Sequence, residues 1–235
     1  MPRLEEFAVN RRWPAQNPDI IQLYSLPTPN GVKIPIALEE MGLPYEAHLI
    51  NFATNDQKSP EFLEINPNGR IPAIIDPHGP GGKPIAIFES GAILLYLAEK
   101  SGKLLPADAV GRLEAIQWVF FQVGGVGPMF GQFGHFYKFA ADKVANNPYP
   151  MERYRDETKR LLGVLELQLA DRPWLAGETY SIADVATFPW VRALGVAYGA
   201  ADVIGLADFP KVADWVSRAA GRPASLVGLN VPPRP

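Results

Sequence analysis

Glu89 and Ser90 stand where an apolar strand pattern changes to a helical pattern, and their side chains suit the binding of a zwitterion. Ser90 occupies the expected N-cap position, and the turn that follows it carries no acidic side chain. The backbone N–H groups of that turn and the Ser90 hydroxyl could therefore bind a carboxylate, while the Glu89 carboxylate could bind an ammonium. The pair predicts a clamp for an α-amino acid. The alternative is an ordinary helix cap beside an ordinary strand-end charge.

Pro72 lies at the start of a short apolar run that precedes this pair. Residues 71–76 and 84–88 are joined by a Gly- and Pro-rich connection, which predicts an antiparallel hairpin. A proline at the start of a strand is allowed in either isomer, and about one X-Pro bond in twenty is cis in folded proteins. A cis Ile71–Pro72 bond would turn the Ile71 backbone away from the sheet, where an extended peptide could pair with it. A zwitterion clamp at Glu89 and Ser90, beside an Ile71 backbone that can pair with an extended peptide, predicts a binding site for a γ-linked tripeptide.

The absence of cysteine narrows the chemistry that the chain can perform. It excludes structural disulfides and a protein thiol nucleophile, so any thiol chemistry must be carried by bound small molecules. The glycines of residues 124–131 do not fit the G-x-G-x-x-G pattern, and neither Gly-Lys pair is followed by Ser or Thr. The sequence therefore gives no sign of a phosphate-binding loop.

The composition is that of a globular protein: 47% of the 235 residues are hydrophobic and 20% are charged, enough for one large or two modest domains. The net charge of -3 gives no basic field for nucleic acid, and His48, His78 and His135 are too scattered to predict a metal site. No uninterrupted apolar run reaches the ~20 residues of a membrane span, and residues 1–12 lack the apolar core of a signal peptide. We expect a cytoplasmic location and neither nucleic-acid nor membrane partners.

The elements that must position the clamp are strands and helices in the order βαβαββα, a thioredoxin-like layout over residues 20–104. A β-helix-β crossover implies one parallel pair, and the hairpin adds an antiparallel strand. Pro35 disfavours an early start of the first helix, which we expect to begin near Lys33. Residues 1–19 show no periodicity and predict an N-terminal arm that could lie over a partner subunit. The expected strands are 20–26, 45–52, 71–76 and 84–88. The expected helices are about 31–41, 59–65 and one that follows the Ser90 cap and ends at Gly102.

Helical patterns replace strand patterns after residue 104. Residues 112–123 are strongly aromatic, and residues 151–169 space their apolar side chains at helical intervals; both predict core helices. Residues 180–184 have the form of an N-terminal capping device. A last helix is expected to start at Pro210 and to end at Arg222. The expected fold class is therefore α/β plus all-α, with a thioredoxin-like domain over 20–104, a helical domain over 105–228 and a tail over 229–235.

Several stretches resemble a known family. NPNGRIPAIID, at residues 66–76, followed by FESGAILLYLAEK, at residues 88–100, resembles the N-terminal domain of cytosolic glutathione transferases. In that family the Ile-Pro bond is cis and the Glu-Ser pair holds the γ-glutamyl end of glutathione. The resemblance continues through LYSLPTPNG, QWVFFQVGGVGPMFGQ and SIADVATFPW, and is nearest to the bacterial nu-class branch, which includes disulfide-bond oxidoreductases and is akin to a fungal nitrogen regulator. It implies glutathione as co-substrate, a glutathione-transferase-type helical domain and a homodimer.

A bound glutathione thiol would need activation, because a thiol of pKa near 8.5 is only about a few per cent ionised at pH 7. The end of the first strand offers Tyr24, Ser25, Thr28 and Asn30. Strand alternation favours a packed Tyr24 and leaves Ser25 a weak candidate. Thr28 and Asn30 alone indicate a turn and a helix cap, whereas the resemblance places their hydroxyl and amide at the sulfur as the catalytic groups. A hydroxyl and an amide activate a thiol only weakly. They therefore suit the polarisation of a disulfide or a thiolate better than attack by the thiol on a poor electrophile.

The resemblance also implies the other ligand-binding residues. Arg153 has the alternative of a solvated helix charge, and the aromatic-rich segment near residue 135 has the alternative of core packing. The predicted glutathione-binding residues are Asn30, Gln57, Arg70, Ile71, Pro72, Glu89, Ser90 and Arg153, and the predicted acceptor-pocket residues are Gln132, His135 and Tyr137.

The function expected from these residues is glutathione-dependent reduction of small disulfides. Two glutathione molecules, or one glutathione disulfide, would occupy each subunit, and their own sulfurs would exchange with the acceptor. The alternatives are conjugation of glutathione to an electrophile, reduction of a peroxide, or a non-catalytic binding or regulatory protein with the same fold.

Overall fold

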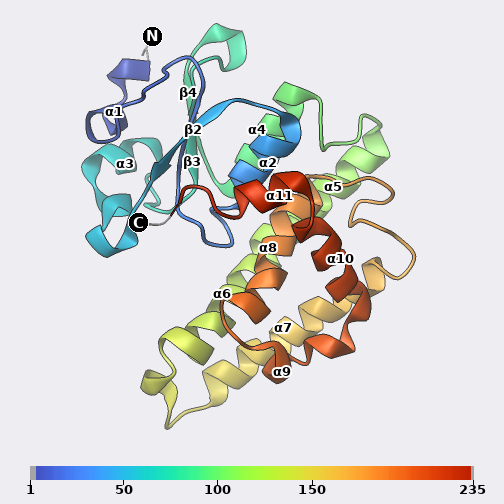
Figure 1. The fold of residues 1–235 in the computed structure, drawn as a ribbon. Coiled ribbons are helices and arrows are strands. Elements are labelled where there is room, and N and C mark those ends of the chain that lie inside the picture. Colours follow the sequence, from blue (N-terminus) through green and yellow to red (C-terminus); the bar gives the residue numbers. More distant parts are fainter. Residues whose placement is uncertain (1–3, 234–235) are drawn as a thin grey trace. The chain divides into compact units, whose positions relative to one another are not determined.

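The computed structural model describes residues 4–233, which form two compact units (Figure 1). The first unit holds the described residues up to Gly102 together with those from Pro223 onward, and the second is Lys103–Arg222. The last short helix, α11 (Pro223–Gly228), belongs to the first unit because it packs against α2 (Lys33–Met41). The expected domain limits remain predictions. The expected helical domain, 105–228, includes residues 223–228, whereas these contacts group them with the first unit.

The first unit is built on a four-stranded mixed sheet with the order β2-β1-β3-β4. β1 and β2 are parallel, as the crossover predicts, and β3 runs antiparallel to both β1 and β4. The predicted βαβαββα order is therefore confirmed, and so is the hairpin. The strands are β1 (Ile21–Ser25), β2 (Tyr45–Leu49), β3 (Ala73–Asp76) and β4 (Ile85–Phe88), and the main helices are α2, α3 (Pro60–Ile65) and α4 (Ser90–Ser101).

Helices cover both faces of this sheet, with α2 and α4 on one face and α1 (Val9–Arg12) with α3 on the other (Figure 1). All five residues of β1 are buried, as expected for a central strand covered on two sides. Helix α2 begins at Lys33, as Pro35 predicts, since proline is tolerated only in the first turn. Short 3-10 segments connect the main elements at Phe52–Thr54, Asp56–Lys58 and Pro80–Gly82.

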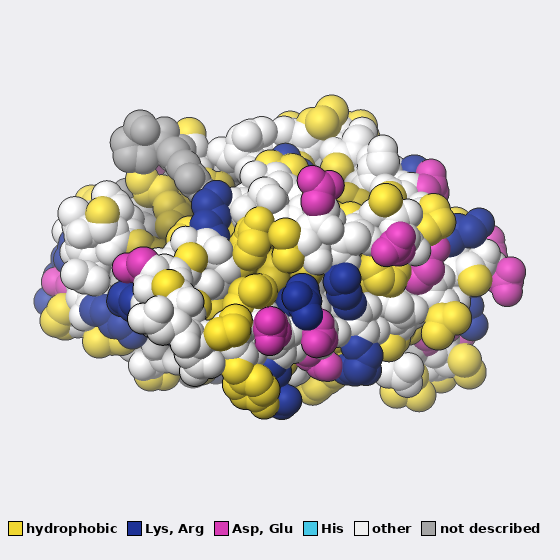
Figure 2. Space-filling view, turned by 90° about the horizontal axis from the view of Figure 1, so that it is seen from below, with side chains coloured by type: hydrophobic (Ala, Val, Ile, Leu, Met, Phe, Trp, Pro, Cys, Tyr) yellow, Lys and Arg dark blue, Asp and Glu magenta, His cyan; other side chains and the backbone are white. Residues whose placement is uncertain are grey.

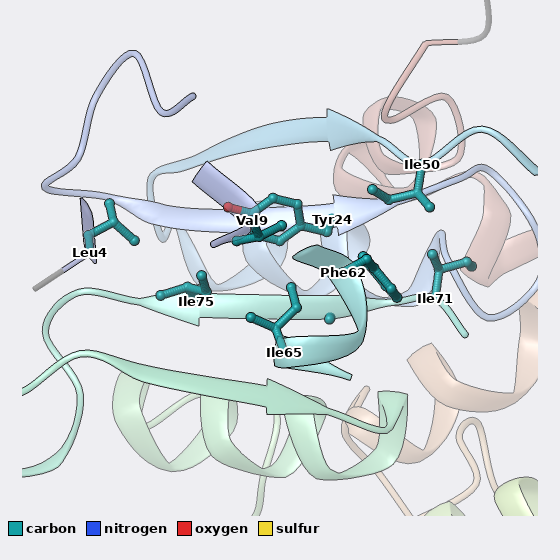
Figure 3. Close-up of a cluster of buried hydrophobic side chains, with 9 residues drawn as sticks. Leu4, Val9, Tyr24, Ile50, Phe62, Ile65, Ile71 and Ile75 are labelled. Carbon is teal, nitrogen blue, oxygen red and sulfur yellow. The ribbon is translucent and has the colours of Figure 1, made fainter. Parts of the chain in front are cut away.

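The described part of the N-terminal arm, whose sequence shows no periodicity, contains two short helical segments. A 3-10 turn, Leu4–Glu6, precedes α1, and both Leu4 and Val9 are buried in the core between the sheet and α3 (Figure 3). The Ala8 amide donates a 2.6 Å hydrogen bond to Glu64 of α3. The arm thus completes the core of its own unit. The first three residues of the expected arm and the last two of the expected tail lie outside the described residues.

The second unit is helical, as predicted. Its long central helix α8 (Ile182–Val196) is almost wholly buried, and Ser181 with Asp184 forms the predicted capping box at its start. The helices around it are α5 (Ala109–Phe121), α6 (Gly127–Gly134), α7 (Tyr149–Gln168), α9 (Ala201–Ile204) and α10 (Pro210–Ala220). Two π-helical segments, Gln122–Val126 and His135–Phe139, flank α6, and 3-10 turns occur at Asp142–Val144 and Leu206–Asp208.

Charged side chains of both signs are interspersed on the face drawn in Figure 2, in keeping with the small net charge of -3. Within residues 4–233, no helix combines the length and the apolar character that crossing a membrane requires. The same part of the chain contains no group of three or more His, Asp or Glu side chains arranged to hold a metal ion.

Candidate functional site

The site begins at the junction of β4 and α4, where the structure corrects the predicted cap by one position. Ser90 is the first helical residue, Glu89 occupies the N-cap position, and no side chain caps the helix. Glu89 is exposed and has φ 70° and ψ 114°, a conformation that non-glycine residues rarely adopt. Such backbone conformations cluster at functional sites, because the surrounding structure must hold them in place.

The first turn of α4 offers backbone donors to an outside acceptor. The first bond within the helix runs from the Ile93 amide to the Glu89 carbonyl, at 2.9 Å, so the amides of Ser90, Gly91 and Ala92 have no acceptor inside the helix. The first turn contains no acidic residue. The positive end of the helix dipole therefore remains available to a carboxylate, with Glu89 beside it as a carboxylate that can receive an ammonium.

The strand register brings the start of β3 to the same edge as this junction. Ala73 pairs with Phe88 of β4 and with Tyr24 of β1, so Pro72 lies one position beyond the ladder on the side of Glu89. The Ile71–Pro72 bond is cis, as the resemblance predicts. Because β3 begins at Ala73, the Ile71 backbone lies outside the ladder of the sheet.

Gln57 and Arg70 belong to two segments that approach each other beside this edge. A Cβ atom at Gly69, which has φ +61°, would lie 2.9 Å from the Gln57 carbonyl oxygen, so glycine is needed there. The Gln57 Oε1 atom is buried and has no hydrogen-bond partner within residues 4–233. Arg70 is exposed, and its carbonyl accepts a 2.5 Å hydrogen bond from the Asn66 side chain.

The four residues considered for contact with the glutathione sulfur lie at the end of β1 and in the loop before α2, and they differ in burial. Tyr24 is fully buried and stacks on His48 with ring centroids 4.8 Å apart, which confirms that it is a packed strand residue. Burial also raises the pKa of its phenol. Ser25 is fully buried as well, and its hydroxyl donates to the Gly31 carbonyl at 3.1 Å. Thr28 and Asn30 are only partly buried, so they are the more accessible members of this group.

Lys33 is the residue of this region that sequence reasoning missed. Its side chain is fully buried, and its Nζ donates to Asn30 Oδ1 at 2.8 Å and to Ser90 Oγ at 3.1 Å. Burial lowers the pKa of Lys33 to about 7, and the negative charge of Glu89 opposes that shift. A lysine inside the apolar run GVKIPIAL was the available signal, because an amphipathic helix normally places its lysines on the polar face.

The remaining predicted residues lie in the second unit. Arg153 lies on α7 and lines an open cleft of 690 Å³ together with Met129, Tyr149 and Glu157. Gln132 lies in α6, and His135 and Tyr137 lie in the second π-helical segment. Gln132 and His135 are exposed, whereas the Tyr137 ring stacks on Phe133 with centroids 5.2 Å apart. Stacking of Phe136 on Tyr154, 5.7 Å between centroids, joins this segment to α7 next to Arg153.

The structure thus brings most of the predicted residues of the first unit together. Asn30 and Ser90 share Lys33 as a partner, Glu89 precedes Ser90, and Pro72 lies across the hairpin from Glu89. Arg153, Gln132, His135 and Tyr137 form a second group, within the helical unit.

Comparison with known proteins agrees with this geometry. Models of the glutathione S-transferase N-terminal and C-terminal domains match residues 20–99 and 151–223. The disulfide-bond oxidoreductase YfcG of Escherichia coli is 49% identical over 208 residues, which are 88% of this chain and 93% of YfcG. The chain therefore belongs to the glutathione S-transferase family.

Two solved structures are also very similar. A glutathione transferase from Burkholderia graminis, with two glutathione molecules bound per subunit, is 57% identical with a TM-score of 0.97, over 100% of this chain and 98% of the other. A glutathione transferase from Pseudomonas putida, with one glutathione disulfide bound per subunit, is 52% identical with a TM-score of 0.96, over 98% of this chain and 100% of the other.

Proposed function

We propose that this protein is a glutathione-dependent disulfide reductase in which both reacting thiols belong to bound glutathione. The observation that carries the proposal is the uncapped start of α4, where free amides and the Glu89 carboxylate suit the two charges of a γ-glutamyl group. The chain has no cysteine, so it has no thiol of its own to exchange. The similarity to a disulfide-bond oxidoreductase and to transferases with two glutathiones or one glutathione disulfide bound supports the same reaction.

The reaction takes place in two exchanges. The thiolate of one glutathione attacks a disulfide RS–SR′, which forms a glutathione mixed disulfide and releases R′S⁻. The thiolate of the second glutathione then attacks the glutathione sulfur of that mixed disulfide, which forms glutathione disulfide and releases RS⁻. Two glutathiones and one disulfide thus give one glutathione disulfide and two thiols, and the protein's part is to bind, orient and polarise.

Each proposed site residue has a part in this scheme. Ser90 and the first amides of α4 bind the α-carboxylate of the γ-glutamyl group, and Glu89 binds its ammonium. The Ile71 backbone at the cis Pro72 bond and the Gln57 side chain bind the peptide, and Arg70 and Arg153 bind carboxylates. Thr28 and Asn30 donate hydrogen bonds to sulfur and lower the pKa of the bound thiol. Gln132, His135 and Tyr137 line the acceptor pocket.

The test is a comparison of three acceptors in the presence of glutathione: 2-hydroxyethyl disulfide, an arylating electrophile and an organic peroxide. We expect the disulfide to turn over with the highest kcat/KM, with glutathione disulfide formed in equal amount to the acceptor consumed. Faster conjugation of the electrophile, or faster reduction of the peroxide, would identify the reaction as one of those instead. No turnover of any acceptor would indicate a binding or regulatory protein.

We further propose that the protein is a cytoplasmic homodimer of the nu class. Exposed apolar side chains on α5, Val110, Leu113 and Phe120, supply a surface that a second copy would cover. Light scattering coupled to size-exclusion chromatography should give twice the subunit mass of 25.8 kDa, and the mass of one subunit would contradict the dimer.

A further inference from the structure

Lys33 is a buried basic residue beside the proposed glutathione site, and none of the ligand contacts proposed above involves it. It is the first residue of α2, and its side chain has no exposed surface. A lysine usually keeps its ammonium in water, because an unpaired buried charge costs several kcal/mol. Two of the atoms that receive its hydrogen bonds, Asn30 Oδ1 and Ser90 Oγ, belong to residues of the proposed glutathione site.

The charged surroundings of Lys33 are strongly one-sided. Glu89, at the N-cap of α4, is a negative charge that acts on it, and α11, which packs on α2, has the sequence PASLVG with no titratable side chain. Glu39 and Glu40 lie at the other end of α2, about two turns away along the helix. A ligand that brings negative groups to Asn30 and Ser90 would place them near the Lys33 Nζ atom and favour its ammonium form.

We propose that Lys33 is a positioning residue of the glutathione site, which orients the Asn30 amide toward the bound sulfur and holds positive charge behind both the thiolate and the γ-glutamyl carboxylate. This inference rests on the proposed function, in which Asn30 lies at the sulfur and Ser90 at the carboxylate.

The geometry gives the orientation of the amide. Because an ammonium has donors and no acceptor, it must face the Oδ1 atom of Asn30, as the 2.8 Å distance shows. The Nδ2 donor of the same amide group then points away from Lys33. An amide donor aimed at sulfur stabilises the thiolate, whereas the flipped amide would present its oxygen to the thiolate and repel it.

The charge of Lys33 responds to the ligand. In the free protein its pKa is lowered to about 7, so at neutral pH the amine is about half protonated. Two anionic groups brought close by would favour the ammonium form and raise that pKa, and by reciprocity the ammonium would lower the pKa of the bound thiol. Lys33 thus couples the binding of the carboxylate to the ionisation of the thiol.

The experiment compares Lys33→Met with Lys83→Met, which removes an exposed lysine from the loop before β4. Methionine is close to lysine in length and apolar, so it suits a buried site. The pKa of the bound thiol is read from the ultraviolet absorbance of the thiolate across pH. We expect it to rise by about 1 or more in Lys33→Met and to stay unchanged in Lys83→Met, since an opposite charge within ~4–6 Å shifts a pKa by about 1–3.

A second ligand separates charge at the sulfur from general damage to the site. S-methylglutathione has the same γ-glutamyl group but no ionisable thiol. Lys33→Met should lose at least fivefold more affinity for glutathione at pH 8 than for S-methylglutathione. An equal loss for the two ligands, or an unchanged thiol pKa, would overturn the proposal. Absence of glutathione binding by the unchanged protein would contradict the proposed function itself, and this inference with it.

A measurement on the unchanged protein guards against misfolding of the variant. With lysine labelled by ¹³C at the ε-carbon, the resonance that titrates near neutral pH reports on Lys33. Its midpoint should move upward by at least 1 when glutathione is added. No movement on saturation with glutathione would overturn the proposal without any substitution.

Discussion

The Nζ atom of Lys33 lies 3.1 Å from the Ser90 hydroxyl oxygen, and this contact joins the start of α2 to the start of α4 across 57 positions of sequence. The same nitrogen lies 2.8 Å from Asn30. One buried amine therefore connects the residue proposed at the glutathione sulfur with the residue proposed at the γ-glutamyl carboxylate. In the proposed complex, this amine would lie behind the central cysteinyl sulfur and the γ-glutamyl end of the tripeptide.

Replacement of Ser90 by alanine tests the clamp at the start of α4. The hydroxyl is a proposed donor to the ligand carboxylate, and a hydrogen bond to a charged group contributes about 1.5–3 kcal/mol. Ser90→Ala should therefore weaken glutathione binding by roughly tenfold or more in titration calorimetry. Ser101→Ala is the matched control, because Ser101 ends the same helix and donates to Leu97. Unchanged glutathione affinity in Ser90→Ala would contradict the proposed binding of the γ-glutamyl carboxylate at the start of α4.

Replacement of Thr28 by alanine tests the group proposed at the sulfur. The Thr28 hydroxyl accepts only a long bond, 3.3 Å, from the Gly31 amide, so its loss should disturb the loop little. Thr28→Ala should lower kcat with 2-hydroxyethyl disulfide by about tenfold or more while the Kd for glutathione changes less than threefold. Thr179→Ala, at an exposed position of the helical unit, controls for the loss of a threonine. Equal losses in kcat and in affinity would contradict a role at the sulfur.

Lys33 should also make stability depend on pH in the absence of ligand. Its pKa is about 7 in the folded chain and about 10.5 in the unfolded chain, so unfolding takes up a proton between these values. Stability supplied by this group therefore increases as pH rises from 7 toward 10. Relative to Lys33→Met, the unchanged protein should gain about 2 kcal/mol in free energy of unfolding between pH 7 and pH 9, measured by urea denaturation. A difference between the two proteins that does not vary with pH would show that Lys33 is charged throughout.

Asp184 should matter for stability and not for ligand binding. Its buried carboxylate accepts hydrogen bonds from the amides of Leu175 and Ser181, both at 3.0 Å, and from the Trp215 indole at 2.9 Å. Asp184→Ala leaves these buried donors without an acceptor, so we expect a loss of about 3 kcal/mol in free energy of unfolding. Thermal melting should show a lower Tm, with glutathione affinity unchanged below the transition. Asp171→Ala, at an exposed position, should melt like the unchanged protein.

The sequence predicted the sheet and the junction of β4 with α4 because their signals are local. The apolar runs of β3 and β4, the turn residues between them and the helix after Ser90 all follow from neighbouring residues, although the cap itself lies at Glu89 and not at Ser90. Element ends depend on backbone angles, and the positive φ of Glu89 leaves no mark in the sequence.

The features that were missed depend on contacts made in three dimensions. Leu4 and Val9 lie in segments of three and four residues, too short for any period to show, and only the core beneath α3 explains their burial. Residues 223–228 were expected in the helical domain but not as a helix, yet they form α11, and Gly228 packs so closely on Ile36 that a Cβ would lie 2.5 Å from its nitrogen. The buried Lys33 contacts both Asn30 and Ser90, and no local pattern encodes its contact with Ser90, 57 positions away in the sequence.

The central claim is that bound glutathione supplies both sulfurs, and the number of glutathione molecules per subunit tests it most directly. Native mass spectrometry of the protein with glutathione should show a mass increase of two tripeptides per subunit, or of one glutathione disulfide after oxidation. Ser90→Ala should reduce this occupancy at the same ligand concentration. A single glutathione per subunit at saturation, or none, would contradict the claim.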